Sequence, residues 1–176
     1  MRKLLILVLS FHFATAFAQE KINPVIKSFG GIYDVPEASF KPDPSIEYKI
    51  VIDVNGVVED KSQIDGSLNN VARMINLHAV GGVSPENMKG VLAIHGKSTY
   101  SILTDKAFKE RFGIDNPNTL LLRELNASGV VITVCGQSLL GREIAINEIN
   151  PLAEVAVSML TTVSNCQMKG YGLLKF

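Results

Sequence analysis

Cysteine and histidine are scarce in this chain of 176 residues, which contains two cysteines and three histidines. Beyond residue 18 they are Cys135, Cys166, His78 and His95, at spacings that match no zinc motif, so the sequence predicts no metal site. Two cysteines are too few for a disulfide scaffold, and a chain of this length can bury a sufficient core without one. The hydrophobic core is therefore expected to hold the fold together.

An excess of charge of either sign is also missing. The 17 basic residues balance 17 acidic ones, which gives no basis for nucleic-acid binding. The glycine-rich signatures of nucleotide-binding loops do not occur, and no serine lies in a G-x-S-x-G hydrolase motif. The sequence therefore indicates no cofactor.

The one segment that could enter a membrane is too short to anchor the chain there. MRKLLILVLSFHFATAFA (1–18) has a basic start, an apolar run and the small-x-small site Ala16-Phe17-Ala18, a pattern typical of a secretory signal peptide. A membrane anchor needs about 20 apolar residues, and polar residues interrupt this run earlier. We expect cleavage after Ala18, export to the periplasm, and a mature protein that begins near Gln19 and lies free of the membrane.

Residues 19–47 contain four of the seven prolines and show no helical or strand periodicity. This pattern predicts an extended N-terminal arm, which could be a linker, wrap a neighbouring subunit or border a pocket. The composition changes at Tyr48, and residues 48–176 are long enough for one domain.

Strand and helix patterns alternate along that domain. Apolar, β-branched runs predict strands at 48–55, 88–96 and 129–134, and helices are expected at 65–79, 98–112, 118–126 and from Ser138 onward. After Pro151 we expect a strand at 154–158, a helix at 159–168 and a strand at 171–175, although one amphipathic helix over 152–168 fits as well.

Helix-length segments between strands imply parallel pairing through right-handed crossovers. Near-continuous apolar strands imply a sheet that is covered on both faces. The sequence therefore predicts an α/β fold, a three-layer α/β/α sandwich with a mainly parallel sheet.

The carboxyl ends of the predicted strands carry Asn55, His95 with Gly96, and Cys135 with Gly136. In open parallel sheets these ends meet at the edge where ligands bind. A cysteine and a histidine on this edge are the candidates for chemistry. His95 could equally be a polar residue of the rim without a role beside Cys135.

Cys135 stands between a strand and a predicted helix. Unpaired backbone N–H groups and the helix dipole would favour its thiolate and lower its pKa. Gly136 allows a tight turn, Gln137 and Ser138 can donate hydrogen bonds, and Arg142 can add positive charge. The alternative is that Cys135 is a small buried apolar residue, and Cys166 is expected to serve packing.

The segment VCGQSLLGREI (134–144), the strand before it and the segment from Ile146 to the end resemble the carboxyl-terminal half of the DsrE/DsrF-like sulfur-relay family. YKIVIDVN, GVLAIHG and RFGIDNPNTLLLRELNASGV resemble exported, single-domain members of the same family. The resemblance covers about 48–176. It implies a Rossmann-like, five-stranded parallel sheet and assembly into compact oligomers.

In sulfur-carrying members of that family, a cysteine after the third strand accepts sulfur as a persulfide and passes it on. Cys135 matches this position, and Arg142 matches a basic residue that often follows. The resemblance thus implies a possible sulfurtransferase or sulfur carrier with donor and acceptor proteins. A non-catalytic, oligomeric module that binds a small ligand or serves assembly is the alternative. A hydrophobic content of 47% also favours a homo-oligomer.

The two cysteines are not expected to form a disulfide. Cys135 ends a strand, whereas Cys166 lies seven or eight residues into the last predicted helix. At about 1.5 Å per residue this places Cys166 on the order of 10 Å below the sheet edge, beyond the reach of a disulfide. Only a free Cys135 could attack a sulfur donor.

Overall fold

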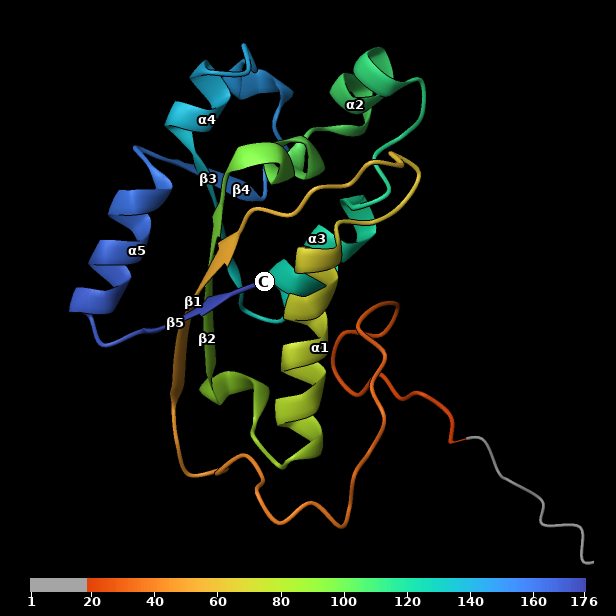
Figure 1. Ribbon diagram of the computed structural model, residues 1–176, viewed down its shortest axis with the longest axis vertical. Coiled ribbons are helices and arrows are strands. Elements are labelled where there is room, and N and C mark those ends of the chain that lie inside the picture. Colours follow the sequence, from red (N-terminus) through yellow and green to blue (C-terminus); the bar gives the residue numbers. More distant parts are fainter. Residues whose placement is uncertain (1–18) are drawn as a thin grey trace, which may run out of the picture.

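The computed structural model describes residues 19–176, so the predicted signal peptide lies outside the described residues. Its centre is a sheet of five parallel strands in the order β4-β3-β2-β1-β5 (Figure 1). The elements are β1 (Tyr48–Val54), α1 (Gly66–Val80), β2 (Met88–Ile94), α2 (Asp105–Phe112), α3 (Thr119–Ala127), β3 (Val131–Cys135), α4 (Gly136–Leu140), β4 (Ala153–Ala156), α5 (Met159–Met168) and β5 (Gly172–Lys175). Short 3-10 helices lie at Pro85–Asn87 (η1), Gly96–Ile102 (η2) and Ile146–Glu148 (η3).

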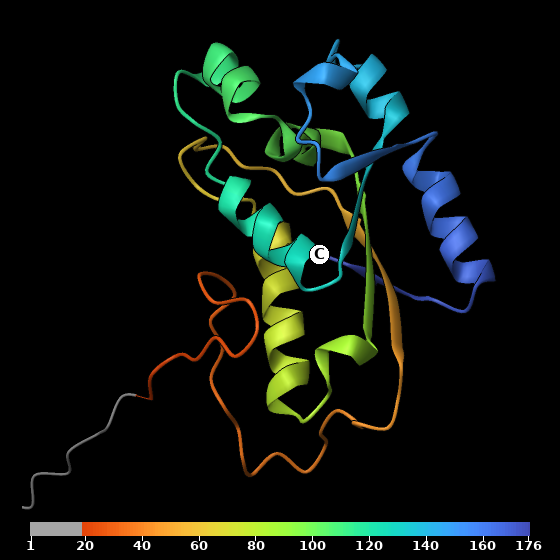
Figure 2. The same ribbon diagram turned by 180° about the vertical axis from the view of Figure 1, so that it is seen from behind.

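Helices cover both faces of the sheet, which confirms the predicted α/β fold with a parallel sheet. Helices α1 and α3 lie on one face and α5 on the other (Figures 1 and 2). The main core fills the space between the sheet and α1 and α3, where Ile52, Leu92 and Ile132 are fully buried. On the opposite face, no residue of α5 is buried.

The prediction of a single helix over 98–112 is wrong, because the helical conformation is interrupted between η2 and α2. Leu103 instead forms an antiparallel bridge with Ile149. Thr104 then caps α2 by accepting a hydrogen bond from the N–H of Ala107 at 3.2 Å. A side-chain cap of this kind starts a new helix.

The structure decides between the two predictions for the C-terminal segment. Residues Ala153–Ala156 form β4, which pairs with β3, and so one helix over 152–168 does not form. Helix α5 spans Met159–Met168, as the strand–helix–strand interpretation predicts, and Ser158 caps its first turn.

The N-terminal arm is packed on α1 through Asn76, which is fully buried. The Asn76 side-chain oxygen accepts hydrogen bonds from the N–H groups of Val25 and Ile26, at 3.0 and 2.9 Å. Its amide nitrogen donates to the carbonyls of Ile26, Phe29 and Gly30. One side chain thus replaces the partners that a strand or helix would give these backbone groups.

Replacing Asn76 with alanine should release the arm. The substitution leaves buried backbone groups without partners, and we expect it to lower the free energy of unfolding by about 3 kcal/mol. Hydrogen exchange at Val25 and Ile26 should accelerate. The exposed Asn126 is the matched control, and its change to alanine should cost less than about 0.5 kcal/mol. Unchanged exchange in the arm of the Asn76 variant would contradict this assignment.

Candidate functional site

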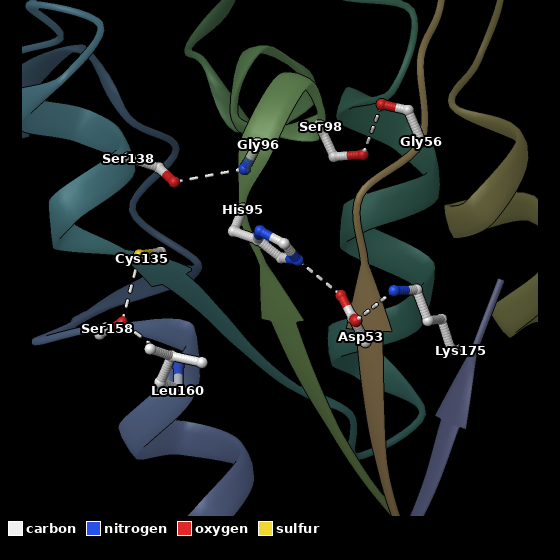
Figure 3. A network of polar contacts seen from close by, with 10 residues as sticks. All are labelled: Asp53, Gly56, His95, Gly96, Ser98, Cys135, Ser138, Ser158, Leu160 and Lys175. Atoms are coloured by element: carbon white, nitrogen blue, oxygen red, sulfur yellow. Dashed lines mark hydrogen bonds and ion pairs between the residues drawn. The ribbon is translucent and has the colours of Figure 1, made fainter.

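The carboxyl ends of β1, β2 and β3 meet at one edge of the sheet (Figure 3). Val54 pairs with Ile94, and Ile94 pairs with Val134. His95 and Cys135 therefore follow paired residues on neighbouring strands. Since side chains alternate along a strand, these two residues leave the same face of the sheet.

Cys135 is both the last residue of β3 and the N-cap of α4. Its side chain is buried, with 4% of the residue exposed, and its Sγ lies 3.9 Å from the Ser158 hydroxyl oxygen. Gly136 is required beside it, because a Cβ there would lie 2.9 Å from the carbonyl oxygen of Ala156. The thiol is thus enclosed between the starts of α4 and α5.

Opposing effects act on the pKa of Cys135. Burial is the largest and raises the pKa, since the thiolate loses solvation. Hydrogen bonds from the backbone N–H of Met159, from the hydroxyl and N–H of Ser138 and from the Ser158 hydroxyl together outweigh it, so that the pKa of Cys135 lies below its ordinary value. The buried thiol of Cys135 therefore loses its proton more readily than an ordinary cysteine.

Helix α5 contributes more to this environment than the sequence indicated. Met159 is its first residue, and its N–H has no partner inside the helix. The thiol consequently faces the positive ends of two helices. Ser158 closes the same turn by accepting a hydrogen bond from the N–H of Leu160 at 3.2 Å (Figure 3).

His95 is held by a carboxylate that sequence reasoning did not select. Its Nε2 lies 2.6 Å from Oδ1 of Asp53, and Oδ2 of Asp53 lies 3.5 Å from the ammonium of Lys175. Asp53 is 8% exposed. The imidazole points towards Asp53 (Figure 3), and within residues 19–176 no hydrogen bond joins it to Cys135. A signal for Asp53 was its charge inside the apolar run YKIVIDVN.

Asn55, Gly96 and Ser138 join the three strand ends. The N–H of Gly96 donates to the Ser138 hydroxyl at 3.2 Å. Gly96 has φ +57°, and a Cβ on it would lie 1.7 Å from the side-chain oxygen of Asn55, so only glycine fits. The loop after β2 is thereby bonded to α4, and its backbone passes close to Asn55 at the end of β1.

Gln137 and Arg142 lie farther from the thiol. Gln137 is exposed, and its side-chain nitrogen donates to the carbonyl of Val157 at 3.5 Å. Arg142 follows α4 and donates from Nη1 to the carbonyl of Ser138 at 3.4 Å. It is not among the groups that shift the pKa of Cys135. Arg142 instead lines a hollow beside α4.

The described residues contain no group of three or more histidine, cysteine, aspartate or glutamate side chains placed to hold a metal ion. Across residues 19–176, the helices are also too short or too polar to cross a membrane. Cys135 and Cys166 are both free thiols.

The family model described as DsrE/DsrF-like matches residues 56–176, a range that contains the whole site except Asp53 and Asn55. The chain belongs to the DsrE/DsrF-like family. No curated protein matches it. Membership of this family suggests a role related to sulfur relay.

Two solved structures share the fold. A protein of unknown function from Methanobacterium thermoautotrophicum, MTH1491, is 15% identical, with a TM-score of 0.57. The ychN protein of E. coli is 20% identical, with a TM-score of 0.50. Each alignment covers 73% of this chain and 99% of the other. At these identities the likeness shows the fold alone.

The two cysteines should titrate differently. Burial raises the pKa of Cys166, an effect that Lys169 only partly offsets, whereas hydrogen bonds lower the pKa of Cys135. Ultraviolet absorbance of the thiolate, measured in Cys135→Ser and Cys166→Ser variants, should give the lower titration midpoint for Cys135. Ser158→Ala should move that midpoint upward, because it removes a donor to the thiolate. A midpoint for Cys135 at or above that of Cys166 would contradict the assignment.

Proposed function

We propose that this protein is an exported sulfur-handling protein in which Cys135 accepts sulfane sulfur as a persulfide and passes it to an acceptor protein. The observation that carries the proposal is the enclosed thiol facing the N–H of Met159 and the hydroxyls of Ser138 and Ser158. A thiolate, not a thiol, is the nucleophile, and these donors favour the thiolate form of Cys135.

The chemistry needs no cofactor. The Cys135 thiolate attacks the outer sulfur of a donor persulfide R–S–SH, the new Sγ–S bond forms, and the S–S bond of the donor breaks. The thiolate R–S⁻ leaves, and the proton remains on the transferred sulfur. Repetition of this step with the acceptor's thiolate as nucleophile moves the sulfur on and restores the Cys135 thiolate.

Burial suits an intermediate of this kind. With 4% of Cys135 exposed, a terminal sulfur on it would be shielded from oxidants and water. The same burial is the observation that favours the alternative, a non-catalytic module in which Cys135 only lines a ligand site. The two proposals differ in whether the thiol gains sulfur.

Intact-mass analysis after treatment with polysulfide separates them. We expect wild-type protein and the Cys166→Ser variant to gain the mass of one sulfur, and Cys135→Ser to gain none. Reduction should reverse the gain. Cys166 is the matched control because its pKa is raised, so its thiolate is scarce near neutral pH. Equal labelling of both cysteines, or none at Cys135, would favour the non-catalytic module.

We further propose that the protein forms a homo-oligomer through β4 and the start of α5. β4 is an edge strand, and its neighbourhood exposes 42% of Val155, 75% of Val157 and 71% of Leu160. An exposed apolar strand edge is a surface that a second copy can cover.

A Val157→Asp, Leu160→Asp double variant should shift the mass measured by light scattering towards that of the monomer. Association would remove water from the two new carboxylates, which costs free energy. Phe40→Asp is the control, since Phe40 is 96% exposed in the N-terminal arm, away from β4. A monomeric wild-type protein at micromolar concentration would rule out this assembly.

A further inference from the structure

A hollow of about 470 Å³ opens at the carboxyl edge of the sheet, beside α4. Three elements that follow different strands build it: the loop after β1, with Glu59 and Lys61; η2, with Lys97 and Tyr100; and the end of α4, with Arg142. Its volume lies within the range of sites for small molecules.

Positive charge dominates the lining. Lys61, Lys97 and Arg142 face a single carboxylate, that of Glu59. Among residues 19–176, these three cations form no ion pair with a carboxylate. An anion in the hollow would thus meet charges that the protein itself leaves unneutralised.

Two of the three cations are held in place. The ammonium of Lys61 donates to the carbonyl of Val58 and lies 5.5 Å from the centre of the Phe112 ring, a cation–π arrangement. The Arg142 guanidinium donates to the carbonyl of Ser138, so it is tied to the helix that Cys135 caps. Because they are already ordered, these groups lose little entropy when they bind an anion.

The hollow is linked to the thiol but does not contain it. Lys97 follows Gly96, which is bonded to Ser138, and Arg142 follows the five residues of α4. Because Cys135 does not line the hollow, a ligand that reaches from the hollow to this thiol must carry its anionic group several atoms away from its reactive sulfur.

We propose that the hollow binds the carboxylates of a low-molecular-weight persulfide, such as the persulfide of a small thiol peptide, and presents its outer sulfur to Cys135. This inference rests on the persulfide function proposed above and names its donor class. Carboxylates match the Arg142 guanidinium and the two ammonium groups, and charge-assisted hydrogen bonds to them are the strong ones. The Cys135 thiolate attacks the outer sulfur of this persulfide, the S–S bond of the donor breaks, and the peptide thiolate leaves.

Binding is tested without sulfur chemistry in a Cys135→Ser background. S-methylglutathione, which cannot transfer sulfur, should bind saturably by calorimetry and more weakly as salt is added. A Lys97→Ala, Arg142→Gln double variant should weaken binding at least about tenfold, the loss of one or two charge-assisted hydrogen bonds. Lys97→Ala alone should also weaken binding. Because Lys97 is exposed, this single variant keeps the test valid if the double variant does not fold. Lys89→Ala, an exposed lysine of β2 outside the hollow, is the control.

Transfer is tested by comparing two donors, glutathione persulfide and the carboxylate-free cysteamine persulfide. Cys135 should gain sulfur faster from the first, and the ratio of the two rates should fall towards one in the Lys97 and Arg142 variants but not in Lys89→Ala. Equal rates in wild type, or S-methylglutathione binding that the variants do not change, would overturn the inference while leaving the persulfide function standing. Normal binding without sulfur gain from either donor would overturn the persulfide function and leave the anion site supported.

Discussion

The parallel register of β1, β2 and β3 is the constraint on which the site depends. Ile52, Leu92 and Ile132 form one paired row across these strands, and all three are fully buried against α1 and α3. A slip of one residue would turn this row to the opposite face and carry Cys135 away from Ser158. The interaction that builds the core thus also places the thiol, because Val54, Ile94 and Val134 lie two residues beyond this row, and their pairing brings His95 beside Cys135.

Given that placement, the properties of the thiol follow from a balance between burial and hydrogen bonding. Burial alone would raise the pKa of Cys135, as partial burial raises the pKa of Cys166. The two thiols differ because hydrogen-bond donors surround the sulfur of Cys135. Two helices begin beside Cys135, and their first turns present N–H groups that no residue within the helix can satisfy. A site that is closed to water yet rich in donors is suited to hold an anionic sulfur.

The sequence predicts those features that local patterns determine. The strand ends at Asn55, His95 and Cys135 could be identified from apolar runs and turn residues, whereas α5 was one of two interpretations that fitted the pattern of residues 152–168 equally well. The partners across the sheet could not be identified. Lys175 reaches Asp53 only because β5 pairs with β1. The order of the strands depends on how the whole domain packs, and no local segment of the sequence reveals it. The break before α2 was missed for a related reason, since the bridge from Leu103 to Ile149 joins segments that are distant in the chain.

Chemistry and recognition are assigned to different parts of the chain. The thiol and its donors come from β3, α4 and the start of α5, whereas Lys61, Lys97 and Arg142 come from the loop after β1, from η2 and from the segment after α4. Surface loops accept substitutions at little cost to stability, while the enclosed surroundings of Cys135 do not, as Gly136 shows by its close approach to Ala156. The charge of the hollow could therefore change among related chains, and with it the preferred donor, without disturbance of the thiol. Under the function that we propose, the loop after β1 and η2, rather than the residues around Cys135, would determine which molecule delivers the sulfur.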